Sequence, residues 1–188
     1  KATQNNLTYY SMDDKNYYGE VFEEFTFRDA IKSKAIVDYE IIIQVMPSNN
    51  DQFKKLDGYT FLKNKKISND RIALVLGVEK LFENFSVNKA INFSNSIEKS
   101  KQFISDIKEE YLNQDIIDFK FHIGSDQNTE LRKKILNEFK ICKKGILSNA
   151  RCLTEGVDVP SVDGVIFSDK KGSIIDIVQA VGRCLRLD

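Results

Sequence analysis

Residues 90–107 read AINFSNSIEKSKQFISDI, an apolar run followed by a polar turn and an amphipathic stretch. The run 90–93 has the length and composition of a buried strand. In the second half, Ile97, Ile104 and Ile107 recur at helical spacing, so one side of a helix would be apolar. Strand, turn and helix in this order form the unit from which parallel α/β sheets are built.

The same unit recurs from residue 37 onward. Further apolar runs predict buried strands at 39–46, 119–123, 145–147 and 164–167. Amphipathic stretches between them predict helices at 71–85 and around Leu131, Ile135 and Phe139. The predicted fold is therefore an α/β domain over 37–188, with a parallel sheet covered by helices on both faces.

The first 36 residues differ in composition from the rest. They begin with a polar, tyrosine-rich stretch that includes Tyr9, Tyr10, Tyr17 and Tyr18, and several phenylalanines follow. We interpret residues 1–36 as an arm or interdomain connector that leads into the α/β domain.

The composition excludes several classes of protein. The chain has 188 residues, of which 41% are hydrophobic, and its formal net charge is zero. No apolar run approaches the roughly 18 residues that span a bilayer, so no membrane segment is predicted. Cys142, Cys152 and Cys184 are an odd number without CxxC spacing, and one histidine cannot complete a metal cluster with them. We expect a cytoplasmic protein with free thiols, whose binding to nucleic acid would depend on local patches of charge.

Small or polar residues follow four of the predicted strands. Ligands of open α/β sheets bind beyond the carboxyl ends of the strands, where helix N-termini offer free amides. Alternatively, these residues only cap the following helices, as Asn95 with Glu98 or Ser173 with Asp176 would do. The residues concerned are Ser94, Asn95, Gly124, Ser125, Ser148, Asn149, Ser168 and Asp169.

The last predicted helix has two distinct faces. Ile174, Val178, Val181 and Leu185 share an apolar face that is predicted to pack on the sheet. The opposite face carries Gln179, Arg183 and Arg186. Arginine binds phosphate oxygens in a bidentate manner and stays charged, so this face is a candidate phosphate site, although exposed arginines are also common surface residues.

The segment 153–160, LTEGVDVP, follows a predicted strand and must turn before the next one. Gly156 allows a positive φ or a close approach of the backbone, and Pro160 restricts the exit from the turn. Thr154 and Asp158 add a hydroxyl and a carboxylate. An ordinary turn explains this composition as well, and its pairing with the arginine-bearing helix is what suggests a site.

Residues 154–160 (TEGVDVP) and 179–186 (QAVGRCLR) together resemble motifs V and VI of superfamily 2 helicases. Residues 91–96 (INFSNS) resemble motif IV, and His122-Ile-Gly124, with Arg132 and Phe139 downstream, resembles the segment between motifs IV and V. Residues 11–39 resemble the connector of DEAD/DEAH-like enzymes related to type I and type III restriction motor subunits. The resemblance covers nearly the whole chain.

The resemblance implies a second RecA-like lobe, which closes on a first lobe of the same polypeptide around ATP and Mg²⁺. Arg186 matches the arginine finger, and Arg183 would lie near the γ-phosphate. Gln179, Gly156, Asp158 and Gly182 would line the nucleotide cleft. The sequence has no GxxxxGK[ST] loop and no acidic box for Mg²⁺, so we expect the chain alone not to hydrolyse ATP.

The same resemblance implies contacts with the nucleic-acid backbone, which would be independent of sequence. We expect DNA as the partner, with RNA as the alternative, since contacts to the backbone do not distinguish the two. The residues expected to lie at this grip are Ser94, Asn95, Thr154, Gly124, Ser148 and Asn149.

Two alternative functions remain. The lobe could belong to a catalytically silent protein that only clamps nucleic acid or a protein partner. It could also be an ordinary doubly wound domain that binds a metabolite at the strand ends, in which case the arginines would be surface residues.

Overall fold

The computed structural model describes residues 2–4, 7–9, 14–43, 59–62, 65–108, 116–150 and 162–184. The chain divides into two compact units, residues 1–37 and 38–188.

The first unit consists of short elements. β1 (Ala2–Gln4) and β2 (Leu7–Tyr9) pair as an antiparallel hairpin, and α1 (Lys15–Tyr18) and α2 (Phe27–Lys32) follow. Thr26 and Asp29 form a capping box at the start of α2, in which each side chain accepts a hydrogen bond from the other residue's backbone amide. Phe22, between the two helices, is 99% exposed. Local capping, rather than a core around this phenylalanine, therefore shapes the segment.

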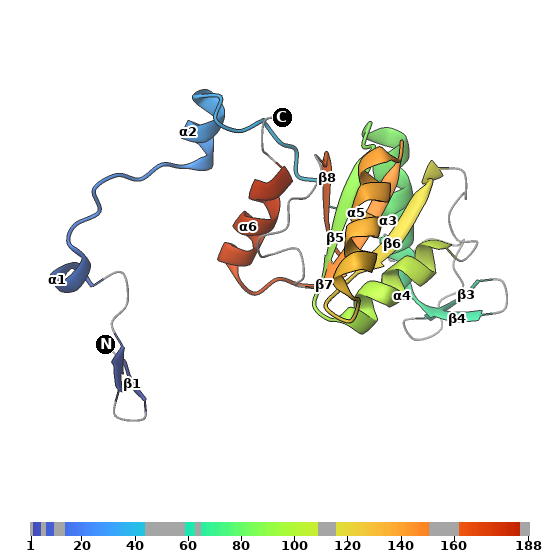
Figure 1. The fold of residues 1–188 in the computed structure, drawn as a ribbon, viewed down its shortest axis with the longest axis horizontal. Helices are drawn as coiled ribbons and strands as arrows, with labels where there is room; N and C mark the ends of the chain where they lie inside the picture. Colours follow the sequence, from blue (N-terminus) through green and yellow to red (C-terminus); the bar gives the residue numbers. More distant parts are fainter. Residues whose placement is uncertain are drawn as a thin grey trace. The chain divides into compact units, whose positions relative to one another are not determined.

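A four-stranded sheet in the order β6-β7-β5-β8 forms the framework of the second unit (Figure 1). Its strands are β5 (Lys89–Ser94), β6 (Phe119–Ile123), β7 (Gly145–Ala150) and β8 (Gly164–Phe167). All three pairings are parallel, so the carboxyl ends of the strands lie at one edge of the sheet. A separate antiparallel hairpin, β3 (Tyr59–Leu62) and β4 (Lys65–Ser68), precedes the sheet.

Four of the five predicted strands are confirmed. The strands at 119–123 and 164–167 match to the residue, and those predicted at 90–93 and 145–147 are somewhat longer in the structure. The strand predicted at 39–46 is wrong for residues 39–43, which form no strand and leave Ile41 and Ile43 exposed. Residues 44–46 lie outside the described residues. An apolar run indicates a tendency to be buried, but a strand also needs a hydrogen-bonding neighbour, which the run itself does not specify.

Helices cover both faces of the sheet, as predicted. They are α3 (Asn69–Asn84), α4 (Ile97–Lys108), α5 (Thr129–Ile141) and α6 (Ile174–Cys184). Side chains of α3 and α4 share one apolar cluster with β5 and β7, and those of α5 and α6 share another with β5, β6 and β7. Side chains alternate between the two faces along each strand, so Ala90 belongs to the first cluster and Ile91 to the second.

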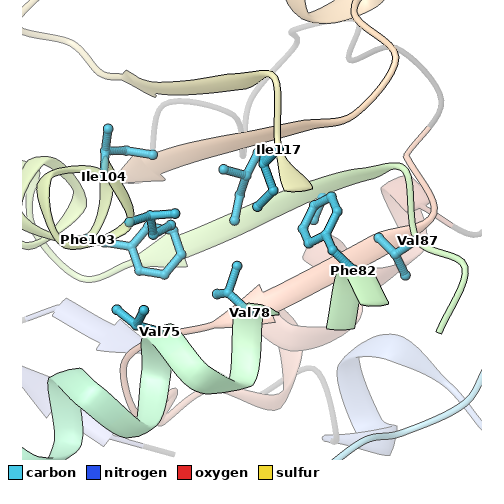
Figure 2. Packing of buried hydrophobic residues seen from close by; sticks show 10 residues of the cluster. Val75, Val78, Phe82, Val87, Phe103, Ile104 and Ile117 are labelled. Carbon is cyan, nitrogen blue, oxygen red and sulfur yellow. The ribbon is translucent and has the colours of Figure 1, made fainter. Parts of the chain in front are cut away.

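The first cluster fills the space between the sheet and its α3–α4 layer. Val75 and Val78 of α3 point toward Phe103 of α4, and Phe82 of α3 points toward Ile117 (Figure 2). Phe82 is only 2% exposed, and it lies near Val87 and Ile117 at the amino ends of the strands. The packing at the amino ends of the strands, on the face that α3 and α4 cover, is thus apolar.

The packing face of α6 differs from the prediction. Ile174 is 78% exposed and Val178 is 40% exposed, whereas Ala180 is 2% exposed and belongs to the second cluster. Val181 is half-buried, and Leu185 lies outside the described residues. The helix is apolar around more than half of its circumference, so spacing alone does not decide which side packs on the sheet. The small side chain of Ala180 allows α6 to lie close to the sheet on that side.

Candidate functional site

The polar residues predicted at the strand ends do come together at one edge of the sheet. Asn92 of β5 lies beside Ser148 of β7, and Ser94 of β5 lies beside Ala150. The Ser94 and Ser168 hydroxyl oxygens are 3.1 Å apart, which connects the end of β5 to the residue after β8. The carboxyl edge is therefore a continuous polar layer across three neighbouring strands.

A buried hydrogen-bonded chain lies beneath this edge, on the face that α4 covers. The Asn92 side-chain amide donates to Ser94 Oγ at 3.0 Å and to Ser148 Oγ at 2.9 Å. Ser148 Oγ lies 2.7 Å from Ser100 Oγ of α4, which in turn lies 2.7 Å from His122 Nδ1 of β6. All five residues are buried. Polar side chains thus replace the apolar core at the carboxyl end of this face.

This series of hydrogen-bonded side chains reaches solvent at Asp126, in the loop after β6. His122 Nε2 is 3.1 Å from Asp126 Oδ1, and Lys101 Nζ is 2.6 Å from Asp126 Oδ2. The hydrogen bond from Lys101, followed by that from His122, lowers the pKa of Asp126 to about 2. At neutral pH the carboxyl group is therefore ionised and acts only as an acceptor.

Gln127 and Gly124 fix the shape of the same loop. Gln127 Oε1 accepts from the Gly124 amide at 3.2 Å, and Gln127 Nε2 donates to the His122 carbonyl at 3.0 Å. A Cβ at Gly124 would lie 2.5 Å from Asp126 Oδ1 and 2.7 Å from His122 Nε2. A side chain at position 124 would therefore displace His122 or Asp126 from their mutual contact.

An exposed rim of cationic and amide groups surrounds the start of α4. The Asn95 amide donates to Asp169 Oδ2 at 2.8 Å, and Lys99 Nζ lies 2.5 Å from Asp169 Oδ1. Lys171 Nζ donates to Asn95 Oδ1 at 2.9 Å. Burial raises the pKa of Asp169, but the hydrogen bonds from Lys99 and Asn95 outweigh it, so the pKa is lowered overall. Ser96, and not Asn95 as predicted, caps α4 by accepting from the Lys99 amide.

The residues predicted to contact nucleic acid fall into two groups. Asn95 is exposed, whereas Ser94, Gly124, Ser148 and Asn149 are buried. Thr154 lies outside the described residues. Of the described residues, the rim thus contains one predicted contact, Asn95, and the other four are buried at or near the strand ends.

The residues predicted to contact nucleotide lie on α6 and in segments outside the described residues. Gln179 is exposed on α6, and Gly182 is half-buried. A Cβ at Gly182 would have no described atom within 4 Å. Arg183 lies within α6, but its side chain is not among those described. Gly156, Asp158 and Arg186 lie outside the described residues.

No role was predicted for Asn92, Ser100 or His122, although Asn92 and His122 lie within stretches that resemble helicase motifs. These residues lie in strands or on the inner side of a helix, where the apolar pattern predicts core. The signal that could have found them is the presence of polar residues in runs that are otherwise buried, since buried polar groups need partners.

The ion pair at Asp126 makes stability depend on pH. The pKa of this carboxyl falls from 3.8 to about 2 in the folded state, so its stabilising effect is present above pH 4 and is lost as the pH falls toward 2. We expect Asp126→Asn to lower the free energy of unfolding by up to about 1 kcal/mol near neutral pH, because the partly exposed pair is screened by solvent. Urea unfolding of both proteins over this pH range checks the prediction, and a difference that stays constant down to about pH 2 would contradict it.

In the described parts of the chain no group of three or more His, Cys, Asp or Glu side chains is placed to hold a metal ion. Nor does any described helix have the length and apolar character needed to cross a membrane.

Comparison with known proteins gives consistent results at the level of sequence. Residues 74–188 match the helicase conserved C-terminal domain family. The probable helicase A859L of African swine fever virus (isolate Tick/Malawi/Lil 20-1/1983) is 26% identical over 188 residues, which cover 98% of this chain and 20% of the viral protein. DEAD-box ATP-dependent RNA helicase 51 of Arabidopsis thaliana is 34% identical over 108 residues, which cover 57% of this chain and 16% of the plant protein. The chain thus spans about a fifth of the length of the viral relative.

Solved structures agree with the sequence matches. The ATP-dependent Type ISP restriction-modification enzyme LlaBIII bound to DNA aligns with a TM-score of 0.65 and 28% identity, covering 94% of this chain and 13% of that one. Domain 2 of the DEAD-box helicase Mss116p bound to an RNA duplex aligns with a TM-score of 0.52 and 22% identity over 61% of this chain and 44% of that one, which supports the fold. The predicted RecA-like fold is confirmed. Because the family match covers more than half of the residues, this chain belongs to the helicase conserved C-terminal domain family.

Proposed function

We propose that this chain is the second motor lobe of an ATP-dependent helicase or translocase that acts on nucleic acid. The observation that carries the proposal is membership of the helicase C-terminal family over residues 74–188, which include the polar carboxyl edge and α6. Motors of this kind couple phosphoryl transfer to movement along a strand, and two lobes together bind the nucleotide and the nucleic acid. This chain would supply one lobe's residues to the nucleotide cleft and to the nucleic-acid grip.

On the nucleotide side, Arg186 acts as the arginine finger and Arg183 binds near the γ-phosphate. Gln179, Gly156 and Asp158 line the same cleft, while the first lobe of the polypeptide holds most of the ATP and its Mg²⁺. Bound ATP supplies the phosphoryl group that is transferred to water. The described part of α6 fits this role, because Gln179 is exposed and a Cβ at Gly182 would meet no described atom within 4 Å.

On the nucleic-acid side, the exposed rim contacts backbone phosphates. Asp169 positions Asn95 and the ammonium group of Lys99, and Asn95 Oδ1 accepts from Lys171. Ammonium and amide groups bind phosphate without reading sequence. Thr154 would extend the grip, and the buried strand-end residues Ser94, Gly124, Ser148 and Asn149 would support it. The DNA-bound restriction enzyme aligns over most of the chain, which favours DNA as the partner over RNA.

Gly182 gives a prediction in which stability and activity change in opposite directions. Glycine within a helix is about 1 kcal/mol less favourable than alanine, and nothing in the described structure would obstruct the added methyl group. We therefore expect Gly182→Ala to raise the urea midpoint of the chain. The same substitution should lower the ATPase rate of the intact polypeptide, because the methyl group would occupy space that ATP needs in the nucleotide cleft. Unchanged ATPase activity would contradict this role for Gly182.

The proposed function is tested by phosphate release from the intact polypeptide that carries this chain. We expect ATP hydrolysis to be stimulated by single-stranded DNA or RNA, and the 188-residue chain alone to be inactive. Oligonucleotide binding without any ATPase activity would instead favour the catalytically silent clamp. Absence of both activities in the intact polypeptide would overturn the proposal.

A further inference from the structure

The buried chain under the carboxyl edge has a defined direction of hydrogen-bond donation. Asp126 is ionised at neutral pH and only accepts, so the proton between it and the imidazole belongs to His122 Nε2. A neutral imidazole with Nε2–H has a lone pair at Nδ1. Ser100 must therefore donate its hydroxyl hydrogen to His122 Nδ1.

The remaining hydrogen atoms follow from that one. Since Ser100 donates to His122, its oxygen accepts from the Ser148 hydroxyl. Ser148 Oγ in turn accepts from the side-chain nitrogen of Asn92, because an amide nitrogen can only donate. The donation thus runs from Asn92 through Ser148, Ser100 and His122 to Asp126, and each step uses one hydrogen atom.

The other neutral tautomer of His122 does not fit these contacts. The Nδ1–H tautomer would place two acceptors, Nε2 and the carboxylate, against each other. With Nε2–H, by contrast, each contact from Asn92 to Asp126 has one donor and one acceptor.

We propose that His122, as the neutral Nε2–H tautomer, is the positioning residue of the nucleic-acid grip. Its Nδ1 holds Ser100, and through it the start of α4 and the ends of β7 and β5. Its Nε2–H holds Asp126, and through it Lys101 and the loop that contains Gly124. This inference rests on the proposed function, because it assumes that the rim above these groups binds nucleic acid.

Two substitutions separate the halves of this role. Asparagine at position 122 places an acceptor near the Nδ1 position, so His122→Asn keeps Ser100 as a donor and loses the contact with Asp126. Glutamine places a donor near the Nε2 position, so His122→Gln keeps the contact with Asp126 and leaves Ser100 without its acceptor. His122→Ala removes both. The matched control is Asp163→Asn, which weakens hydrogen bonds to the amides of Asn88 and Lys89 at the opposite edge of the same sheet.

The first measurement is the affinity of the intact polypeptide for a single-stranded oligonucleotide. We expect His122→Asn and His122→Gln each to weaken binding about 2- to 10-fold, the equivalent of one lost hydrogen bond, and His122→Ala to weaken it further. The KM for ATP should change less than about twofold, because neither His122 nor its partners Ser100 and Asp126 are among the residues assigned to the nucleotide cleft. Asp163→Asn should lower the urea midpoint without weakening oligonucleotide binding. Equal oligonucleotide affinity of the wild type, His122→Asn and His122→Gln would overturn the inference.

The second measurement is the tautomer itself. His122 is the single histidine of the 188-residue chain, so ¹⁵N chemical shifts of its imidazole can be assigned without ambiguity in an untagged sample. We expect the Nε2–H form near neutral pH, and the Nδ1–H form or the imidazolium would overturn the inference even if the variants prove too unstable to assay. A wild-type polypeptide that binds no oligonucleotide would overturn the proposed function and this inference together. Wild-type binding with unaffected variants would overturn this inference alone.

Discussion

Arg186→Ala in the intact polypeptide is expected to lower the rate of nucleic-acid-stimulated ATP hydrolysis by about 10³- to 10⁵-fold. In phosphoryl transfer an arginine finger stabilises charge that develops on the γ-phosphate in the transition state, so its loss acts on kcat more than on the affinity for ATP. This residue ends the GRxxR pattern at 182–186. Steady-state phosphate release at saturating ATP and oligonucleotide measures the effect.

Two further variants make this result specific. Arg186→Lys keeps the positive charge but loses the planar, bidentate geometry, so it should remain strongly impaired. Lys80→Ala removes one positive charge from an exposed position of α3 and should leave the rate unchanged. Hydrolysis by Arg186→Ala within about tenfold of the wild type would exclude the arginine-finger role.

Phe82→Ala is expected to lower the free energy of unfolding by about 3–5 kcal/mol. The Phe82 ring is 2% exposed and packs between α3, α4 and the sheet in the first apolar cluster, so its removal leaves a cavity that rigid neighbours fill only in part (Figure 2). Such a loss is a large fraction of the stability of an ordinary domain. Urea unfolding followed by circular dichroism measures it.

The matched control for this change is Phe22→Ala. It removes the same ring from a position that is 99% exposed in the first unit, and the free energy of unfolding should change by less than about 0.5 kcal/mol. A comparable loss at both positions would show that the effect of Phe82→Ala does not arise from burial.

Strands and helices of the sheet were predictable because their apolar patterns are strong. Residues 119–123 and 164–167 form strands as expected, and Ile135 and Phe139 are buried on one side of α5. The convergence of polar strand ends was predictable too, since it follows from parallel pairing alone.

The partners of buried polar groups were not predictable. Nothing in the sequence around Ser100 shows that its hydroxyl lies 2.7 Å from both Ser148 Oγ and His122 Nδ1. These contacts depend on where α4 lies along the strand direction and on the strand order, in which β7 lies between β5 and β6. Burial of Ala180 rather than Ile174 likewise depends on how α6 is rotated, which a helix that is apolar on several sides leaves open.

The hydroxyl and amide groups under the carboxyl edge also constrain how relatives of this chain can diverge. A single exchange at Asn92, Ser100, His122 or Ser148 would leave a neighbouring buried group without its donor or acceptor, at a cost that one compensating exchange next to it could remove. These four positions should therefore covary, either keeping a consistent set of donors and acceptors or becoming apolar together.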